Sequence, residues 1–212
     1  MYFPRMPFRT RAVSLTLLLS LALLPAAFAH KDKYKPEPVI PAGNGGLDGA
    51  TVIIIRHAEK PDSGTGLAPE GKQRAAAYVD YFKKFKVDTT PVQITDLYAA
   101  GDSKESARPR LTLEPLARSL RLHLDTTCKN KDYGTLSAIL RSGPPNRVIL
   151  VCWHHGTIPD LVYALGGDPN IFPTGKWPGS SYGGMVVMRY DAQGKLIKAK
   201  FLNEHLMPGD SA

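Results

Sequence analysis

The sequence predicts an α/β fold, a three-layer α/β/α sandwich with a mostly parallel central sheet. Residues 51–55 and 148–152 are uninterrupted apolar runs, typical of strands that are buried on both faces. Amphipathic segments separate the strand candidates, and such alternation indicates a parallel sheet covered by helices. Both runs lead into histidine, at His57 and at His154-His155. Since the carboxyl ends of parallel strands share one edge, the sequence predicts a site at that edge.

The first 29 residues have the three zones of a secretory signal. A basic stretch without acids precedes an apolar stretch at residues 12–24, and a small-residue cleavage site ends at Ala29. An uncleaved anchor needs roughly 20 apolar residues, and this stretch is shorter and interrupted. We therefore expect cleavage after Ala29, a secreted or periplasmic protein, and no stable membrane insertion after cleavage.

The elements then follow in order along the chain. Residues 30–49 are rich in Lys, Pro and Gly and predict an irregular segment before a single domain at 50–212. Pro69 opens a helix, because apolar residues after it recur at helical spacing. The other expected elements are a strand at 93–99, a helix at 109–120, a short strand at 122–124, a helix at 133–141, a strand at 147–152, a helix at 157–165 and a terminal hairpin of 185–190 and 195–202.

Charge and cysteine content narrow the function classes. Residues 30–212 carry 24 Lys and Arg against 19 Asp and Glu, a mild excess without the clustered basic stripes of nucleic-acid-binding proteins. The excess is compatible with an anionic small-molecule substrate. Export would permit a disulfide between Cys128 and Cys152. Cys152 lies in an apolar run, where cysteine usually acts as a small buried hydrophobe, so we expect free thiols.

Arg56 and His57 are the first candidates for chemistry. A neutral imidazole is a nucleophile near neutral pH, and a guanidinium offers a cationic fork for phosphoryl oxygens. Taken alone, this pair fits equally well a strand that runs into a polar turn. The second strand strengthens the chemical interpretation, because a histidine that follows it would meet His57 across one pocket.

Only one of the two consecutive histidines is expected to enter that pocket, because adjacent strand residues point to opposite faces. We select His155, since Gly156 permits close backbone approach to a ligand and Thr157 would cap the next helix. His154 is then expected to point away. For the same reason a metal site built from His57, His154 and His155 is not expected.

Four motifs in one order resemble those of the histidine phosphatase superfamily, which has the phosphoglycerate mutase-like fold. They are Arg56-His57-Ala58-Glu59-Lys60 after a strand, Leu67-Ala68 with Gly71 and Arg74-Ala75, an arginine four residues before Thr112-Leu113-Glu114-Pro115, and a strand that leads into His155-Gly156 before a helix. The similarity covers residues 51–190. More narrowly, residues 152–160 and Lys176-Trp177-Pro178 resemble a bacterial branch of small exported members.

The resemblance implies a role for each matching residue. These are His57 as the nucleophile that becomes phosphorylated, Arg56 as the adjacent phosphate clamp, Arg108 as the second clamp and His155 as the second histidine. Arg110 is a rival for the second clamp. Arg108 is preferred because its separation from Thr112 matches the family and because Pro109 would leave it at a helix N-terminus, which favours anions.

The proton donor for the leaving group is not identified by any motif. Glu59 is the nearest candidate in sequence, and Asp125 and Asp132 are alternatives, although each also fits a solvated charge or a cap. Related sequences often have an acidic residue at the position of His154. The histidine found here departs from that pattern and puts a proton-donor function at this position in doubt.

The resulting hypothesis is an exported, metal-independent phosphomonoesterase that needs no cofactor. Its expected partner is a phosphorylated small molecule or a phosphopeptide, and not nucleic acid. One alternative is a non-catalytic protein that binds a phosphorylated ligand. The other is a phosphoglycerate mutase-type phosphotransferase, which is less favoured because the residues after His57 lack a Ser-x-Trp-Asn pattern. The sequence does not address the oligomeric state.

Overall fold

The computed structural model describes Tyr2 and residues 45–210, so the predicted signal peptide apart from Tyr2, residues 30–44 and residues 211–212 lie outside the described part. Its elements are β1 (Thr51–Arg56), α1 (Pro69–Lys83), β2 (Lys86–Val87), β3 (Thr90–Pro91), β4 (Asp96–Ala99), α2 (Arg108–Leu120), β5 (Leu124–Asp125), α3 (Tyr133–Ser142), β6 (Val148–Trp153), α4 (Ile158–Ala164), the 3₁₀ turn η1 (Pro169–Ile171), β7 (Gly184–Tyr190) and β8 (Leu196–Asn203). None of the described helices has the length and apolar character needed to cross a membrane.

Six strands form the central sheet in the order β5-β4-β6-β1-β7-β8. The first four are parallel to one another, β7 runs antiparallel to β1, and β8 runs antiparallel to β7. In the middle of the sheet, Ile53 of β1 lies opposite Leu150 of β6. The two apolar runs are therefore adjacent central strands, and the prediction of a mostly parallel sheet is confirmed.

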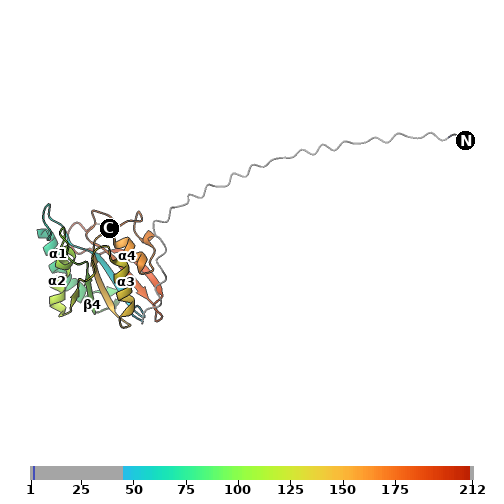
Figure 1. Ribbon diagram of the computed structural model, residues 1–212, viewed down its shortest axis with the longest axis horizontal. Coiled ribbons are helices and arrows are strands. Elements are labelled where there is room, and N and C mark those ends of the chain that lie inside the picture. The colour runs from blue at the N-terminus through green and yellow to red at the C-terminus, as the bar shows by residue number, and fades with distance from the viewer. Residues whose placement is uncertain (1, 3–44, 211–212) are drawn as a thin grey trace. The chain divides into compact units, whose positions relative to one another are not determined.

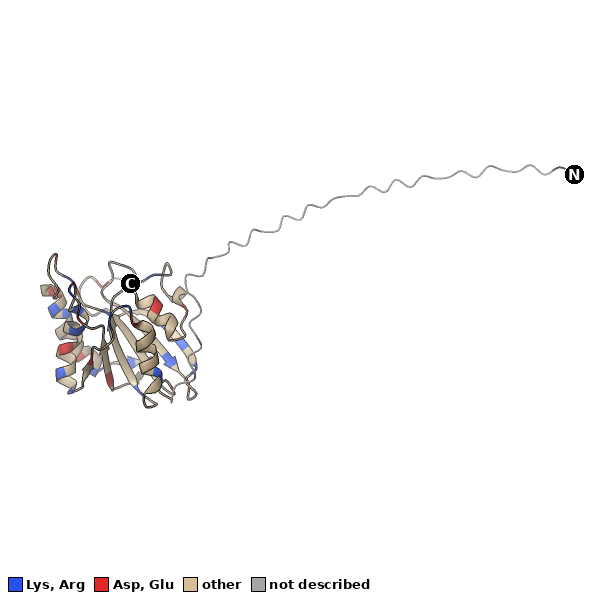
Figure 2. Ribbon diagram, viewed as in Figure 1, with Lys and Arg blue, Asp and Glu red and all other residues tan. Residues whose placement is uncertain are grey.

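Helices cover both faces of this sheet (Figure 1). Ile53 and Ile55 of β1 pack in the same core as Tyr78 of α1 and Leu113 of α2. The alternate residues Val52 and Ile54 belong to the opposite core, which includes α3 and α4. Charged residues lie mainly on the helices and loops, whereas the central strands carry few (Figure 2). The three-layer prediction is confirmed, with α1 and α2 on one face and α3 and α4 on the other.

Some short features differ from the sequence prediction. The strand predicted at 93–99 pairs only over Asp96–Ala99, and the hairpin of β2 and β3 was not predicted because two-residue strands carry no periodic signal. Leu47 is already part of the core, three residues before the expected start of the domain. Cys128 and Cys152 are buried free thiols, as predicted.

Candidate active site

The centre of the site forms where β1 and β6 end side by side. Arg56, the last residue of β1, lies in register with Trp153, the last residue of β6. The backbone N–H of His57 donates to the carbonyl of Trp153 at 3.0 Å. As a result, the ring centroids of His57 and His154 lie 5.1 Å apart in an edge-to-face arrangement. Two histidines separated by almost a hundred residues of chain therefore meet at one edge of the sheet, as the strand pattern predicts.

The ring of His57 is held in one tautomer. Its Nδ1 lies 2.7 Å from the carbonyl oxygen of Ala58. Because a carbonyl only accepts, Nδ1 must carry the proton, and Nε2 keeps its lone pair. The N–H of Ala58 donates to Oγ1 of Thr112 at 2.9 Å, and that hydroxyl donates to the carbonyl of Arg108 at 2.8 Å. Thr112 thus ties the turn after the nucleophile to the first turn of α2.

The selection of His155 over His154 was wrong in one respect. Strand alternation applies only as far as Trp153, where β6 ends. The carbonyl of His154 accepts from the N–H groups of Thr157 and Ile158, so a turn begins there and His154 no longer points away from His57. His155 lies close enough to Arg56 to interact with it electrostatically. Both histidines therefore belong to the surroundings of the site, and His154 is the one in contact with the candidate nucleophile.

Arg56 is 3% exposed and is oriented by the loop at residues 179–182. Its Nη1 donates to the carbonyls of Gly179 and Ser181 at 2.6 and 3.0 Å. Its guanidinium carbon lies 3.8 Å from the centre of the Tyr182 ring, in cation–π geometry. Its Nε is buried and has no hydrogen-bond partner among the described residues. One donor of this guanidinium therefore has no partner within the described structure.

Arg108 opens α2, as the sequence predicts, and its Nη1 donates to the carbonyl of Gly64 at 3.3 Å. Its Nε is also buried without a partner in the described part of the chain. The rival, Arg110, donates three hydrogen bonds to Asp102 and lies 3.6 Å from Glu114. Arg110 is therefore neutralised by carboxylates, whereas Arg108 acts on both His57 and His154 as an unneutralised charge.

Burial and positive neighbours keep these histidines neutral. Burial first, and then the charges of His154, Arg56 and Arg108, together lower the pKa of His57 to about 3, against the raising effect of the hydrogen bond to Ala58. Burial and then Arg108 lower the pKa of His154 to about 4. The pKa of His155 is lowered as well, by burial and then by Arg56. The pocket thus concentrates cationic and neutral basic groups, an environment that attracts an anion.

Glu59 is not available in the role predicted for it. Its carboxylate accepts from Nε and Nη2 of Arg74 at 2.8–3.2 Å. Both carboxylate oxygens of Glu59 are thus engaged as acceptors by the guanidinium, so the side chain is directed at Arg74 and not at a leaving group. Among the alternatives, Asp125 accepts from the N–H and hydroxyl of Thr127, and Asp132 from the N–H of Lys129, so both stabilise local turns.

Several residues at the site carry no sequence signal for their function. Thr112 stands in a motif, but its link to Ala58 spans 54 residues. Tyr182 and the carbonyls of Gly179 and Ser181 reach Arg56 across more than 120 residues, and the carbonyl of Ser181 also accepts from Nε1 of Trp177 at 3.0 Å. Residues 45–210 contain no cluster of three or more His, Cys, Asp or Glu side chains placed to hold a metal ion.

The arrangement suits a tetrahedral oxyanion. The buried guanidinium of Arg56 and the half-buried one of Arg108 each have an Nε without a partner among the described residues, and a neutral imidazole with a free Nε2 lies beside them. Charge-assisted donors of this kind stabilise the equatorial oxygens of a phosphoryl group, which is the main requirement of phosphoryl transfer.

Comparisons with known proteins bear on the fold. No protein-family model and no curated protein sequence matches the chain. Among solved structures, the chain resembles the protein histidine phosphatase SixA complexed with tungstate, with 18% identity, a TM-score of 0.51, and coverage of 73% of this chain and 97% of that one. It also resembles a phosphoglycerate mutase from Plasmodium falciparum, with 16% identity, a TM-score of 0.50, and coverage of 77% and 96%. The protein thus has the phosphoglycerate mutase-like fold, and its structural neighbours are members of the histidine phosphatase superfamily.

Proposed function

We propose that this chain is a phosphatase that hydrolyses phosphomonoesters through a phosphohistidine formed on His57. One observation carries the proposal. His57 is neutral with its Nδ1 proton directed to the Ala58 carbonyl, and it lies among basic groups that include the buried Arg56 and the half-buried Arg108, whose Nε donors have no partner among the described residues. A nucleophile with a free Nε2 next to an anion pocket is the minimum that covalent phosphoryl transfer requires.

The proposed reaction has two displacements. In the first, the Nε2 lone pair of His57 forms a bond to phosphorus while the bond from phosphorus to the leaving oxygen breaks, and that oxygen takes the electron pair and a proton. In the second, water attacks phosphorus, the P–N bond breaks and its electrons return to Nε2, which releases inorganic phosphate. Arg56 and Arg108 stabilise the charge on the equatorial oxygens in both steps.

The proton for the leaving group comes, in this proposal, from His154. It contacts His57, and the main charged groups of the described residues that act on either ring are histidines and arginines, not carboxylates. A bound phosphoryl dianion raises the pKa of a neighbouring imidazole, so His154 gains its proton when substrate binds. A pocket without a carboxylic acid favours leaving groups that depart as weak bases. We therefore expect aryl phosphates to react faster than alkyl phosphates.

The substrate class and the location of the enzyme are part of the proposal. The structural neighbours are named as a protein histidine phosphatase and a phosphoglycerate mutase, which supports a phosphorylated small molecule or a phosphorylated protein segment as substrate. The three-zone pattern of residues 1–29 supports export to the periplasm or the exterior. N-terminal sequencing of the protein recovered from a cell envelope fraction tests the cut after Ala29.

The decisive test is hydrolysis of p-nitrophenyl phosphate by the purified protein. We expect turnover that vanadate inhibits, and a loss of at least about 10⁴-fold in His57→Ala, the scale on which removal of a covalent nucleophile acts. His123→Ala is the matched control, since His123 is exposed and outside the site. A trapped, acid-labile phosphoenzyme is expected in the parent and not in His57→Ala. Undiminished turnover in His57→Ala would refute the mechanism.

Other outcomes would favour the alternatives. Tight binding of phosphate or vanadate without turnover at any pH would indicate a phosphate-ligand binding protein. Movement of a phosphoryl group within a substrate, without net release of phosphate, would indicate a phosphotransferase of the mutase type.

A further inference from the structure

A second buried arginine lies next to the pocket but does not belong to it. Arg74 of α1 is 2% exposed, and its guanidinium joins two carboxylates from distant parts of the chain. It donates to Glu59, two residues after the nucleophile, at 2.8–3.2 Å. It also donates to Asp210, near the end of the described chain, at 2.6 and 2.9 Å. A third carboxylate, Glu204, lies 3.5 Å from Nη1.

Charge balance rules out a role for Arg74 in binding an anion. One guanidinium faces three carboxylates, and two of them accept from it bidentately. The donors of an arginine neutralised in this way are used by its carboxylate partners, so it offers none to a phosphoryl group. The function of Arg74 must therefore lie in what its partners hold in place.

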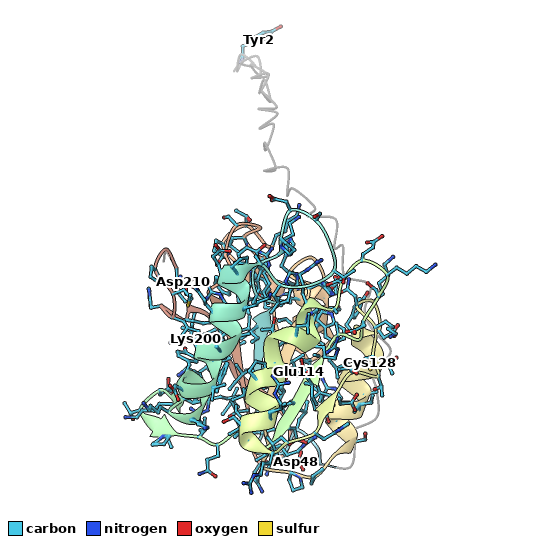
Figure 3. The ribbon with its side chains drawn as sticks, turned by 90° about the vertical axis from the view of Figure 1, so that its left-hand side faces the viewer. Tyr2, Asp48, Glu114, Cys128, Lys200 and Asp210 are labelled. Carbon is cyan, nitrogen blue, oxygen red and sulfur yellow. The ribbon has the colours of Figure 1, made fainter. Side chains whose placement is uncertain are left out.

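One partner is the segment that follows β8, here called the C-terminal tail (residues 204–210). The carboxylate of Asp210 accepts from the N–H groups of Leu206 and Met207 at 3.1 and 2.9 Å, so it closes the turn of the tail as well as the ion pair. Figure 3 shows Asp210 beside α1, at the end of the domain away from Asp48. The tail is thereby fastened to α1 next to the site.

The tail also packs against the loop that orients Arg56. The N–H of Glu204 donates to the carbonyl of Gly183 at 2.7 Å. A Cβ on Gly183 would lie only 2.4–2.6 Å from atoms of the Asp210 carboxyl group, so the two are in direct contact. Gly183 follows Tyr182, whose ring stacks on the Arg56 guanidinium. Displacement of Asp210 would therefore reach Arg56 through two consecutive residues, Gly183 and Tyr182.

On the other side, the same ion pair supports the turn after His57. The carbonyl of Glu59 accepts from the N–H of Ala68 at 3.0 Å, and a Cβ on Gly71 would lie 2.5 Å from that carbonyl oxygen. The backbone of Glu59 thus packs directly against the first turn of α1, and the carboxylate of Glu59 is bound by Arg74. Asp210, through Arg74 and Gly183, contacts both walls of the pocket.

We propose that Asp210 and Arg74 are positioning residues that set the geometry of the phosphate pocket, by bracing the Glu59 turn and the 179–183 loop from the C-terminal tail. The proposal rests on the proposed function only in that the pocket binds phosphate. It predicts that a change in the tail alters anion affinity at Arg56 although no tail residue touches the anion.

The test compares two aspartates that close turns in the same way at opposite ends of the domain. Asp210→Asn retains an acceptor for the tail N–H groups but weakens the bond to Arg74. Asp191→Asn is the matched control, because Asp191 accepts from Gln193 and Lys195 in the β7–β8 turn, at the opposite end of β7 from Gly184. With inorganic phosphate as the calorimetric probe, we expect affinity to fall about tenfold in Asp210→Asn and to stay unchanged in Asp191→Asn.

Two further variants separate positioning from loss of folding. Gly183→Ala keeps Asp210 but places a methyl group against it, so it should also weaken phosphate binding. Tyr182→Leu removes the stacking ring. If the tail acts through this loop, the effects of Asp210→Asn and Tyr182→Leu on phosphate affinity should not add, because the two residues are coupled. We then expect the double variant to bind phosphate less than about twofold more weakly than Tyr182→Leu alone.

The outcomes distinguish this inference from the proposed function. Unchanged phosphate affinity in a folded Asp210→Asn or Gly183→Ala, or full additivity with Tyr182→Leu, overturns the positioning role while leaving the phosphatase intact. Phosphate binding that responds to these variants in a protein without turnover supports the positioning role and overturns the phosphatase alone. A parent protein that binds neither phosphate nor vanadate overturns both.

Discussion

Two buried arginines, Arg56 and Arg74, differ in what surrounds them. Arg56 donates to two backbone carbonyls and stacks on Tyr182, and its Nε has no partner in the described structure. Arg74 is bound by Glu59 and Asp210 and lies near Glu204. Burial is nearly equal, at 3% and 2% exposure. The first site carries excess positive charge and the second excess negative charge.

This difference in partners separates an arginine that binds a ligand from an arginine that supports the structure. A buried charge without a counter-ion is costly and is retained where it meets a ligand, whereas a buried charge with several counter-ions holds structure. The nature of the partner therefore distinguishes the two functions better than burial does. An unpaired Nε alone does not distinguish the two functions, because Arg147, before the start of β6, also has one although Asp96 is its counter-ion. Arg56 forms no ion pair with a carboxylate of the described residues, whereas the guanidinium of Arg74 is saturated by carboxylates.

Replacing each arginine by methionine tests this distinction between the two arginines and should have the largest effects. Arg56→Met should lower phosphate affinity and kcat/KM by about 10²–10³-fold, with a modest loss of stability, because it removes a donor aimed at the anion. Arg74→Met should lower the free energy of unfolding by about 3–5 kcal/mol, because it leaves buried carboxylates unpaired. Urea denaturation and phosphate calorimetry measure both effects. Similar profiles for the two variants would contradict the distinction.

The second prediction uses Glu204, the most buried carboxylate of the Arg74 site. Burial raises its pKa to about 8 from 4.5, against the hydrogen bond from Tyr78 and the charge of Arg74. The charged and titratable groups that face it are Tyr78, Tyr81 and Arg74 of α1, Glu59 after β1, Cys152 of β6 and Asp210 of the tail.

Because its pKa is higher in the folded state, Glu204 binds its proton more tightly there. Its stabilising contribution is complete below pH 4.5 and is lost as pH rises through about 8. We expect the free energy of unfolding to decrease by a few kcal/mol over this window, and Glu204→Gln to remove most of the decrease. Denaturant unfolding at a series of pH values measures it. A parallel pH dependence in the variant would disprove the assignment.

The third prediction concerns the pocket itself. His57 and His154 should titrate near pH 3 and 4, well below the ordinary 6.5, because burial and cations disfavour their charged forms. Bound phosphate supplies negative charge and should raise both pKa values. Nitrogen chemical shifts of the imidazole rings, followed by NMR with and without phosphate, report both effects. Midpoints near 6.5 in the free protein would show that the pocket is less desolvated than the structure indicates.

The smallest expected effect is at Arg110, which the sequence leaves as a rival of Arg108. Its ion pair with Asp102 lies at the surface, where such pairs contribute less than about 1 kcal/mol. Arg110→Gln should leave phosphate affinity unchanged, whereas Arg108→Gln should weaken it strongly. Equal losses in the two variants would return Arg110 to the list of phosphate ligands.

Long apolar runs made the fold predictable from the sequence. Residues 51–55, which are all β-branched, and the apolar residues 148–152 indicate doubly buried strands, and they became β1 and β6 in the centre of the sheet. The helices followed from their periodicity. The two-residue strands β2 and β3 have no period to detect, so they could not be predicted.

For the site, what the sequence alone determined is the set of groups that follow the two central strands and open α2: Arg56, His57, the histidine pair and Arg108. The end of a strand and the start of a helix depend on nearby residues, so the residues at these points can be identified from the sequence. Tertiary structure decided which histidine meets His57, because a turn begins at His154, and it decided that Glu59 belongs to Arg74. Those outcomes depend on contacts between residues far apart in the chain, such as Arg74 with Asp210 and Arg56 with Ser181, for which spacing in sequence carries no information.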